Sequence, residues 1–316
     1  MAHLPNSTTE VTDRKSTPVL DSGNFRKKTV VITGASSGIG QACALQMSQA
    51  GWHVFGTVRK IEDKERLQST DLTAVIIDVQ DRSTIFAAAE QITSELAGRG
   101  LDGLVNVAGI GMVRPLEYAT NEDLQDIFDI NVFGQVAVTQ AFLPLIRKRH
   151  GRIVNITSVG AHIAIPFGGL LNASKSAFGL LSDTLRLELH PFGIHVCTVE
   201  PGAIKTPAVD KTLGDIESVI SNLPAPGAAQ YRTMLERFAR IAYAREMDGS
   251  PPDVVAKAVH HALTARRPRI RYTVGKHAKL LGTLPRILSD WLLDAIRFRI
   301  AGLPSGFGAA EPIRHG

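Results

Sequence analysis

The chain has 316 residues, of which 44% are hydrophobic and 6% aromatic, and its formal net charge is +5 at pH 7. This composition is that of a folded globular protein and excludes a disordered or collagen-like chain. No run of 18 uninterrupted apolar residues occurs, so we expect no membrane-spanning helix. Residues 1–25 are polar and lack the apolar region of a secretory signal, so we expect a flexible tail on a cytoplasmic protein.

Short runs rich in Val and Ile alternate with longer helical stretches along most of the chain. Seven runs are expected to form strands, at residues 29–33, 53–58, 74–79, 103–107, 153–156, 195–199 and 271–274. Five stretches are expected to form helices, at residues 39–50, 84–96, 121–149, 173–189 and 252–265. Continuous apolar strands are typical of parallel sheets buried on both faces. The alternation therefore predicts one α/β domain over residues 26–275, with a doubly wound parallel sheet and helices on both faces.

Two segments depart from this alternation. Residues 207–250 form an insertion, and residues 276–316 form a C-terminal extension whose part 278–300 is amphipathic. The insertion has apolar residues at helical spacing between residues 231 and 243, which suggests a substrate lid. Four interpretations of such stretches stay open: closing a substrate pocket, forming a dimer surface, lying in a membrane interface, or packing against their own domain.

The cysteines and the basic residues give little indication of function. Cys43 and Cys197 fall in an expected helix and an expected strand, so we predict two buried free thiols in a reducing compartment. The basic cluster could attract nucleic acid or anionic lipid, but it lacks interleaved aromatic residues and a nucleic-acid motif, so we interpret it as a solvated face. Its members are Arg266, Arg267, Arg269, Arg271, Lys276 and Lys279. No metal site is expected.

A glycine-rich turn follows the first expected strand and opens the first expected helix. Glycines allow positive φ and let the backbone approach a pyrophosphate, which then lies at the N-terminus of the helix. We therefore predict a dinucleotide site formed by Gly34, Ser36, Ser37, Gly38, Ile39 and Gly40.

The end of the second expected strand bears on the choice between NAD(H) and NADP(H). An acidic residue there would bind the adenosine ribose hydroxyls of NAD and repel a 2′-phosphate. Thr57 is uncharged and Arg59 follows it, so a guanidinium is available for the phosphate. NADP(H) is therefore the preferred cofactor, and NAD(H) stays open.

Three further motifs come at the ends of expected strands, where ligands of open α/β sheets collect. They are Asp78-Val79, Asn106-Val107-Ala108-Gly109 and Pro201-Gly202-Ala203-Ile204-Lys205-Thr206. With the glycine-rich turn, these motifs make the chain resemble the short-chain dehydrogenase/reductase family over about residues 28–275, with Val107 in place of the family's second asparagine. The resemblance implies a single Rossmann-type domain with strand order 3-2-1-4-5-6-7. It also implies cofactor contacts at Asp78, Val79, Asn106, Ala108, Gly109, Pro201, Gly202, Ile204 and Thr206.

The resemblance further implies a catalytic set. Ser158 matches the serine that binds the substrate oxygen, Lys175 the lysine that holds the nicotinamide ribose, and Asn131 the asparagine that anchors a water beside that lysine. Leu171 occupies the position of the family's catalytic tyrosine, four residues before Lys175. Leucine cannot exchange a proton, so we expect severely impaired hydride transfer between nicotinamide and a carbonyl or secondary alcohol.

Three interpretations of Leu171 stay open. The chain could be a pseudoenzyme that binds NADP as a sensor or partner subunit, or an engineered form of a parent that carries tyrosine. Alternatively, His162 or Tyr118 could supply substitute acid–base chemistry.

Substrate and partners are implied by the resemblance and by the amphipathic segments. The sequence around residues 53–60 and the apolar C-terminal segment are most similar to members that act on steroids, retinoids or other lipophilic alcohols. Helices 121–149 and 173–189 carry more apolar positions than one sheet-facing stripe needs, so we predict a homodimer or homotetramer. Peripheral membrane contact through the C-terminal segment is also expected, and nucleic acid is not.

Overall fold

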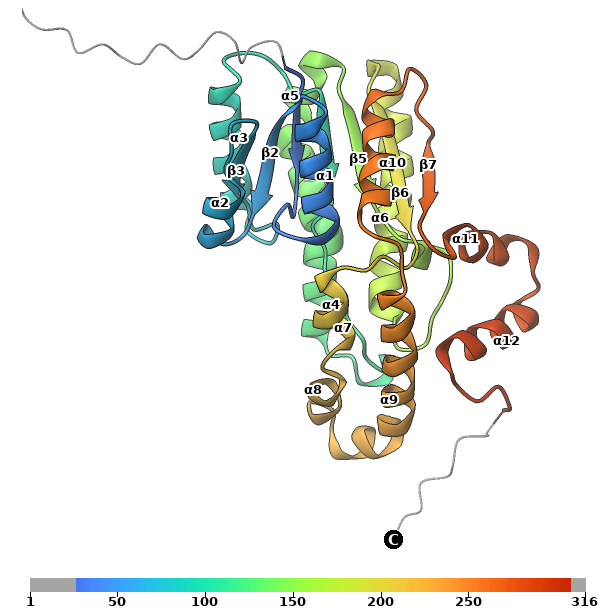
Figure 1. The fold of residues 1–316 in the computed structure, drawn as a ribbon. Coiled ribbons are helices and arrows are strands. Elements are labelled where there is room, and N and C mark those ends of the chain that lie inside the picture. Colours follow the sequence, from blue (N-terminus) through green and yellow to red (C-terminus); the bar gives the residue numbers. More distant parts are fainter. Residues whose placement is uncertain (1–26, 308–316) are drawn as a thin grey trace, which may run out of the picture.

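A seven-stranded parallel sheet forms the centre of the protein, which a computed structural model describes over residues 27–307 (Figure 1). The strands are β1 (Thr29–Ile32), β2 (His53–Val58), β3 (Leu72–Ile76), β4 (Gly103–Asn106), β5 (Arg152–Ile156), β6 (His195–Pro201) and β7 (Arg271–Val274). Their order is β3-β2-β1-β4-β5-β6-β7, which confirms the predicted order and the doubly wound fold. The tail predicted for residues 1–25 lies outside the described residues.

Helices cover both faces of the sheet. One face carries α1 (Gly38–Gln49), α2 (Ile61–Leu67) and α10 (Asp253–Thr264), and the other carries α3 (Arg82–Glu95), α5 (Gly134–Arg149) and α6 (Gly169–Leu189). Figure 1 shows α1 and α10 in front of the strands. Successive strand residues point to opposite layers, so Val30 and Ile32 pack under α1 and α10 while Val31 packs under α3 and α5.

The sequence placed several element boundaries incorrectly. The third strand was expected at residues 74–79, but β3 ends at Ile76, so Asp78 and Val79 lie in the loop beyond it. The helix expected at residues 121–149 contains α4 (Asn121–Phe128), a π-helical turn (Asp129–Phe133) and α5. The short helix α2 was not expected.

The continuous helical segment Asn121–Arg149 is a core helix. Of the helices in residues 27–307, it alone is long and apolar enough to span a membrane, and 61% of its most apolar window is buried inside the protein. Phe142 and Ile146 lie fully buried against the sheet. Its apolar character is therefore accounted for by packing.

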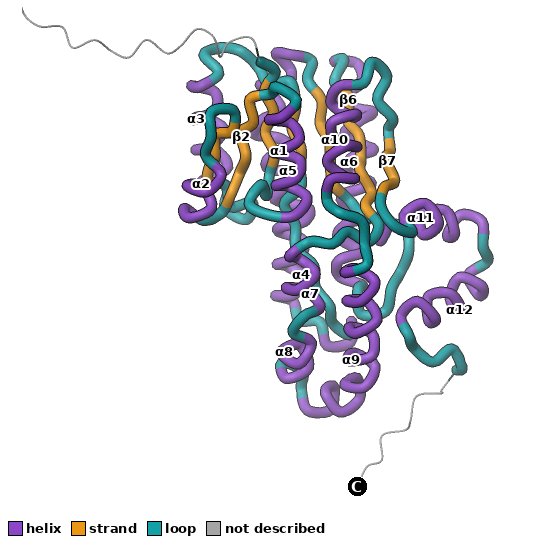
Figure 2. Tube along the Cα trace, viewed as in Figure 1, coloured by secondary structure: helices purple, strands orange, loops and turns teal. Residues whose placement is uncertain are grey.

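The insertion forms a helical extension at the carboxyl edge of the sheet. Its helices are α7 (Pro207–Leu213), α8 (Ile216–Ser221) and α9 (Ala225–Met247), and Figure 2 shows them with α4 beyond the ends of the strands. Helix α9 is longer than the predicted stretch 231–243. This extension has its own apolar cluster, which includes Leu235 and Phe238 of α9 and Ala301 from the C-terminal segment.

The C-terminal segment forms two helices. They are α11 (Ala278–Ile287) and α12 (Asp290–Ala301), separated at Leu288 and Ser289, where the backbone is extended. Figure 1 shows both standing to one side of the sheet and the helical extension.

Both cysteines are free and buried, as predicted. Burial raises the pKa of the Cys43 thiol to about 12 and that of Cys197 to about 11. Neither thiol is therefore ionised near neutral pH.

Candidate active site

The glycine-rich turn is closely packed and fits a dinucleotide. Gly34 and Gly38 have φ of +65° and +55°, and a Cβ at Gly40 would collide with the carbonyl oxygen of Gly34. Helix α1 begins at Gly38 with no side-chain cap from Ser37 and no acidic residue in its first turn. Its first N–H groups are thus left available to a phosphate, which the positive end of the helix attracts.

Two arginines follow strand β2, and Thr57 of that strand is hydrogen-bonded to the glycine-rich turn. Thr57 is 1% exposed and its carbonyl oxygen accepts a hydrogen bond from the Ala35 N–H at 2.8 Å, whereas Arg59, just past β2, is exposed. Arg66 on α2, which was not predicted from the sequence, donates from its Nη2 to the carbonyl oxygen of Ser36 at 2.8 Å. A helical interpretation of residues 61–67 would have indicated it. Arg66 also forms an ion pair with Asp63 on the same helix, at 2.8 Å.

The predicted contact Asn106 has its side chain turned into the protein. Its Nδ2 donates to Thr139 Oγ1 at 2.9 Å and to Asn155 Oδ1 at 2.8 Å, and the residue is 1% exposed. Its Oδ1 is buried without a partner in the part of the chain that the structure describes, so the whole side chain lies inside the sheet layer. Gly109, three residues later, is exposed, and a Cβ there would lie 3.3 Å from the Nζ of Lys175.

The motif after β6 meets the glycine-rich turn. Pro201 ends β6, Gly202 donates its N–H to the carbonyl oxygen of Val274 at 2.9 Å, and Ile204 is buried. Thr206 occupies the N-cap position of α7, and a Cβ at Gly38 would lie 3.3 Å from its Cβ. Two motifs far apart in the sequence therefore lie side by side.

The loop after β3 is fixed by Thr84. Its Oγ1 accepts from the Asp78 N–H and donates to the Asp78 carbonyl oxygen, both at 3.0 Å. Asp78 is half-buried and Val79 is 8% exposed, so both lie at the carboxyl edge of the sheet although neither belongs to β3.

Ser158 and the start of α6 lie together. Ser158 Oγ accepts a hydrogen bond from the Gly160 N–H at 3.0 Å. A Cβ at Gly160 would lie 3.3 Å from Ser158 Oγ and 2.6 Å from Asn172 Oδ1, so the serine borders the first turn of α6. Leu171, half-buried, is in that turn and shares a helix face with Lys175.

Lys175 is a buried ammonium without a carboxylate partner. Its Nζ donates to the carbonyl oxygen of Ile156 at 3.1 Å, which is its one acceptor among the described residues. Desolvation lowers the pKa of Lys175 to about 8. Two of its three N–H donors are therefore left for a ligand.

Asn131 lies in the π-helical turn and is fully buried. Its Oδ1 accepts from the Ile110 N–H at 2.9 Å, and its Nδ2 donates to the Ile110 carbonyl oxygen and to Ser174 Oγ, both at 3.0 Å. The side chain thus connects the loop after β4 to α6. Its expected role of holding a water beside Lys175 stays a prediction.

The two candidates for a substitute acid are engaged elsewhere. His162 Nε2 lies 2.8 Å from Glu200 Oε1, and Glu200, 2% exposed, also forms an ion pair with Arg271. Tyr118 packs edge-on against Tyr231 at 5.9 Å, inside the apolar cluster of the helical extension. His162 is thus paired with a carboxylate and Tyr118 is packed among aromatic rings, and the role of substitute acid stays a prediction for both.

Phe167 lies between Ser158 and the start of α6 in the sequence. It ends the loop that leads from Ser158 to α6, and its φ of +63° is a strained conformation for a bulky residue. Its carbonyl oxygen accepts from the Arg114 N–H at 2.9 Å, and its ring lies 5.4 Å from that of Phe238. Contacts with α9 therefore hold this loop in place.

The chain is similar in sequence and in fold to known proteins of one family. The model of the short chain dehydrogenase family matches residues 28–217. Retinol dehydrogenase 5 of Mus musculus is 35% identical over 295 residues, 90% of each chain, and dehydrogenase/reductase SDR family member 9 of Bos taurus is 34% identical over 290 residues, 85% of this chain and 88% of the relative. A short-chain dehydrogenase structure from Streptomyces avermitilis has a TM-score of 0.65 at 30% identity, and the match covers 87% of this chain and 95% of that one.

The buried ammonium of Lys175 predicts a pH dependence of stability. Its pKa of about 8 lies below the ordinary value of 10.5, so between these two pH values only the unfolded chain carries the proton. Raising the pH through this window therefore stabilises the folded protein, by about 3 kcal/mol in total. We expect the free energy of unfolding of the unchanged protein, minus that of Lys175→Met, to rise by about this amount from pH 7 to pH 10.5, measured by urea denaturation without cofactor. Lys257→Met, at an exposed position of α10, is the control, and a difference independent of pH would contradict the expectation.

Proposed function

The chain belongs to the short-chain dehydrogenase/reductase family, and from this we propose that it acts with NADP(H) on a lipophilic carbonyl or secondary alcohol. The observation that carries the proposal is the position of Lys175, whose free donors lie beneath Gly109 at the edge of the sheet where the glycine-rich turn also ends. When bound, the nicotinamide supplies or accepts the hydride.

The roles of the chain's own residues follow from their chemistry. Ser158 donates a hydrogen bond to the substrate oxygen, and Lys175 donates to the ribose hydroxyls of the cofactor. Leu171 offers no proton to the developing alkoxide. Ser158 and Lys175 still polarise the carbonyl, directly or through water, so slow residual turnover is expected.

The lipophilic substrate class is supported by the helical extension. Two aromatic side chains of its apolar cluster, Tyr231 and Phe238, lie against Phe167 at the end of the loop that follows Ser158. The relatives include a protein named retinol dehydrogenase, and retinol is an apolar alcohol. Retinoids and steroids are therefore the substrates to test first.

Leu171 also favours a second candidate function, a cofactor-binding protein without turnover. The glycine-rich turn and Lys175 do not need a tyrosine at position 171 in order to bind a dinucleotide. Turnover at saturating cofactor separates the two functions.

We expect NADPH to bind more tightly than NADH, by roughly 1–3 kcal/mol, because Arg59 and Arg66 can form charge-assisted bonds to the 2′-phosphate. Fluorescence titration measures both affinities. Arg59→Ala combined with Arg66→Ala should weaken NADPH binding about tenfold or more and leave NADH binding nearly unchanged. Lys148→Ala, at the far end of α5, is the control cation. Equal affinity of the unchanged protein for the two cofactors would refute the preference.

Restoring the tyrosine should restore turnover. General acid–base catalysis is worth about 10²–10⁴-fold, so Leu171→Tyr should raise kcat at least about 10²-fold with little change in cofactor affinity. The assay uses NADPH with a panel of steroid, retinoid and aliphatic carbonyls. Leu171→Phe is the matched control, since it adds the ring without the hydroxyl. A tyrosine variant that is no faster would favour the non-catalytic function, and a fast unchanged enzyme would direct attention to His162→Ala.

We also propose a homodimer or homotetramer formed through α5 and α6. Several of the apolar residues that suggested this from the sequence, among them Val132, Phe142 and Phe178, are buried within their own chain. Leu181, which also suggested it, is exposed, and so are Phe133, Leu180 and Leu187. Leu180 is 70% exposed, so Leu180→Glu should convert the assembly to monomer in light scattering, whereas Phe86→Glu on α3 should not. A 34.0 kDa species for the unchanged protein at micromolar concentration would exclude the assembly.

A further inference from the structure

Helices α11 and α12 are attached to the rest of the protein by few buried side chains. Ala278 is the one buried residue of α11, and Leu293 and Ala301 are those of α12. Figure 2 shows the two helices as an arm beside the sheet and the helical extension. Leu281, Leu284, Ile296 and Phe298 are half-buried, so one side of each helix is partly covered and the other side is exposed.

The exposed surface of these two helices carries four large apolar side chains. In α11, Leu280 and Ile287 are 58% and 70% exposed, and in α12, Trp291 and Leu292 are 77% and 44% exposed. We refer to these four residues as the C-terminal apolar face. Leu280 and Ile287 are seven residues apart and thus lie on one side of α11. Large apolar side chains gathered in so short a stretch mark an interaction surface.

Basic residues lie in the same segment as the C-terminal apolar face. Residues 276–301 carry an excess of three positive charges, from Lys276, Lys279, Arg286, Arg297 and Arg299 against Asp290 and Asp294. Lys279 and Arg286 each come one residue before an exposed apolar residue of α11. Arg297 pairs with Asp294, and Lys276 with Asp248, whereas Lys279, Arg286 and Arg299 form no ion pair with any other residue in the described range.

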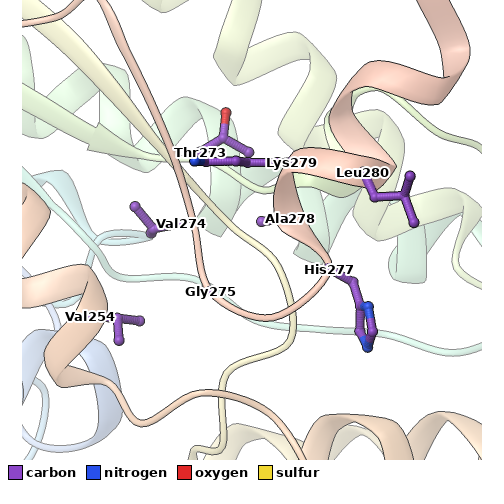
Figure 3. Close-up of a pocket in the computed structure, with 8 residues that line it drawn as sticks. All are labelled: Val254, Thr273, Val274, Gly275, His277, Ala278, Lys279 and Leu280. Atoms are coloured by element: carbon purple, nitrogen blue, oxygen red, sulfur yellow. The ribbon is translucent and has the colours of Figure 1, made fainter.

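A shallow depression of about 480 Å³ lies at the base of α11. Lys279 and Leu280 contribute to its lining, together with Val274 of β7 and Val254 of α10 (Figure 3). Figure 3 shows Leu280 and His277 projecting outward from the first turn of α11, away from Val254 and Val274. These two side chains border the depression and point away from its Val254 and Val274 side.

We propose that α11 and α12 bind the surface of a bilayer that contains anionic phospholipids. Trp291, Ile287 and Leu280 enter the boundary between headgroups and acyl chains, and Lys279, Arg286 and Arg299 contact the lipid phosphates. An apolar stripe beside unpaired cations, with an exposed tryptophan, has the chemistry of an interfacial helix. A second copy of the chain fits less well, because a twofold contact would bring the same cations against themselves.

The two tryptophans provide a direct test. Trp52 is 5% exposed and Trp291 is 77% exposed, and the chain has no others, so a change in fluorescence on binding reports Trp291. The full-length protein is mixed with vesicles of phosphatidylcholine alone or with phosphatidylglycerol. We expect a blue shift, quenching by brominated lipid and co-sedimentation with the anionic vesicles, all reduced by added salt.

Two variants locate the contact, and a third serves as the control. Ile287→Ser and Lys279→Glu should each weaken binding to the anionic vesicles about tenfold or more. Phe86→Ser, which removes a 57% exposed side chain on α3, should leave it unchanged. All three positions are exposed, so far-ultraviolet circular dichroism should be preserved in each variant.

Several outcomes would overturn the proposal. They are absence of binding to anionic vesicles, equal binding to phosphatidylcholine alone, or binding insensitive to Ile287→Ser. Trp291 emission that is already blue-shifted without vesicles, and that reddens on dilution as the assembly dissociates, would show that a second copy covers the face. None of these measurements depends on the proposed reaction.

Discussion

One buried amide, that of Asn131, joins three segments that are far apart in the sequence. The π-helical turn between α4 and α5 directs it inward, where it bonds both backbone groups of Ile110 and the hydroxyl of Ser174. Ser174 in turn donates to the carbonyl oxygen of Leu171 at 2.8 Å, within the first turn of α6. Because a buried amide left without partners is costly, this arrangement fixes the loop after β4 and the start of α6 together. The positions of Leu171 and Lys175 depend on it.

The sheet could be predicted from the sequence because each strand is a continuous apolar run, and its order followed from the resemblance carried by the motifs. Boundaries were harder, since Ile77 and Val79 are as buried as strand residues although they belong to a loop. Helix α2 has apolar residues only at its two ends, Ile61 and Leu67, so periodicity could not reveal it. The sequence predicted where the site residues lie in the fold, but not the directions in which their side chains point. Asn106 shows the difference, because its place at the end of β4 was right while its amide faces the interior.

The loop after Ser158 is held by other interactions than the hydrogen bonds of Asn131. Leu235 and Phe238 of α9 pack with Phe167 and Tyr231 into a cluster separate from the two layers on the sheet. Such a cluster stabilises the extension by burying apolar area, and it also constrains the loop after Ser158, whose end at Phe167 would otherwise relax from its positive φ. His162, held by Glu200, fixes the other end of this loop from the side of β6. The loop is thus fixed at both ends by side chains other than those of the proposed reaction.

Leu171 and Lys175 separate proton transfer from cofactor binding. The family has a tyrosine at the position of Leu171, and that tyrosine exchanges the proton beside the lysine. An ammonium buried as deeply as that of Lys175 opposes folding unless acceptors compensate it, and the protein supplies one, the carbonyl oxygen of Ile156. Under the proposed function, the ribose hydroxyls of the cofactor accept from the remaining N–H donors of Lys175 beside the exposed Gly109. Leu171 therefore removes the family's acid and leaves the contact of Lys175 with Ile156 in place, so the proposed slow turnover and the proposed cofactor binding are compatible in one chain.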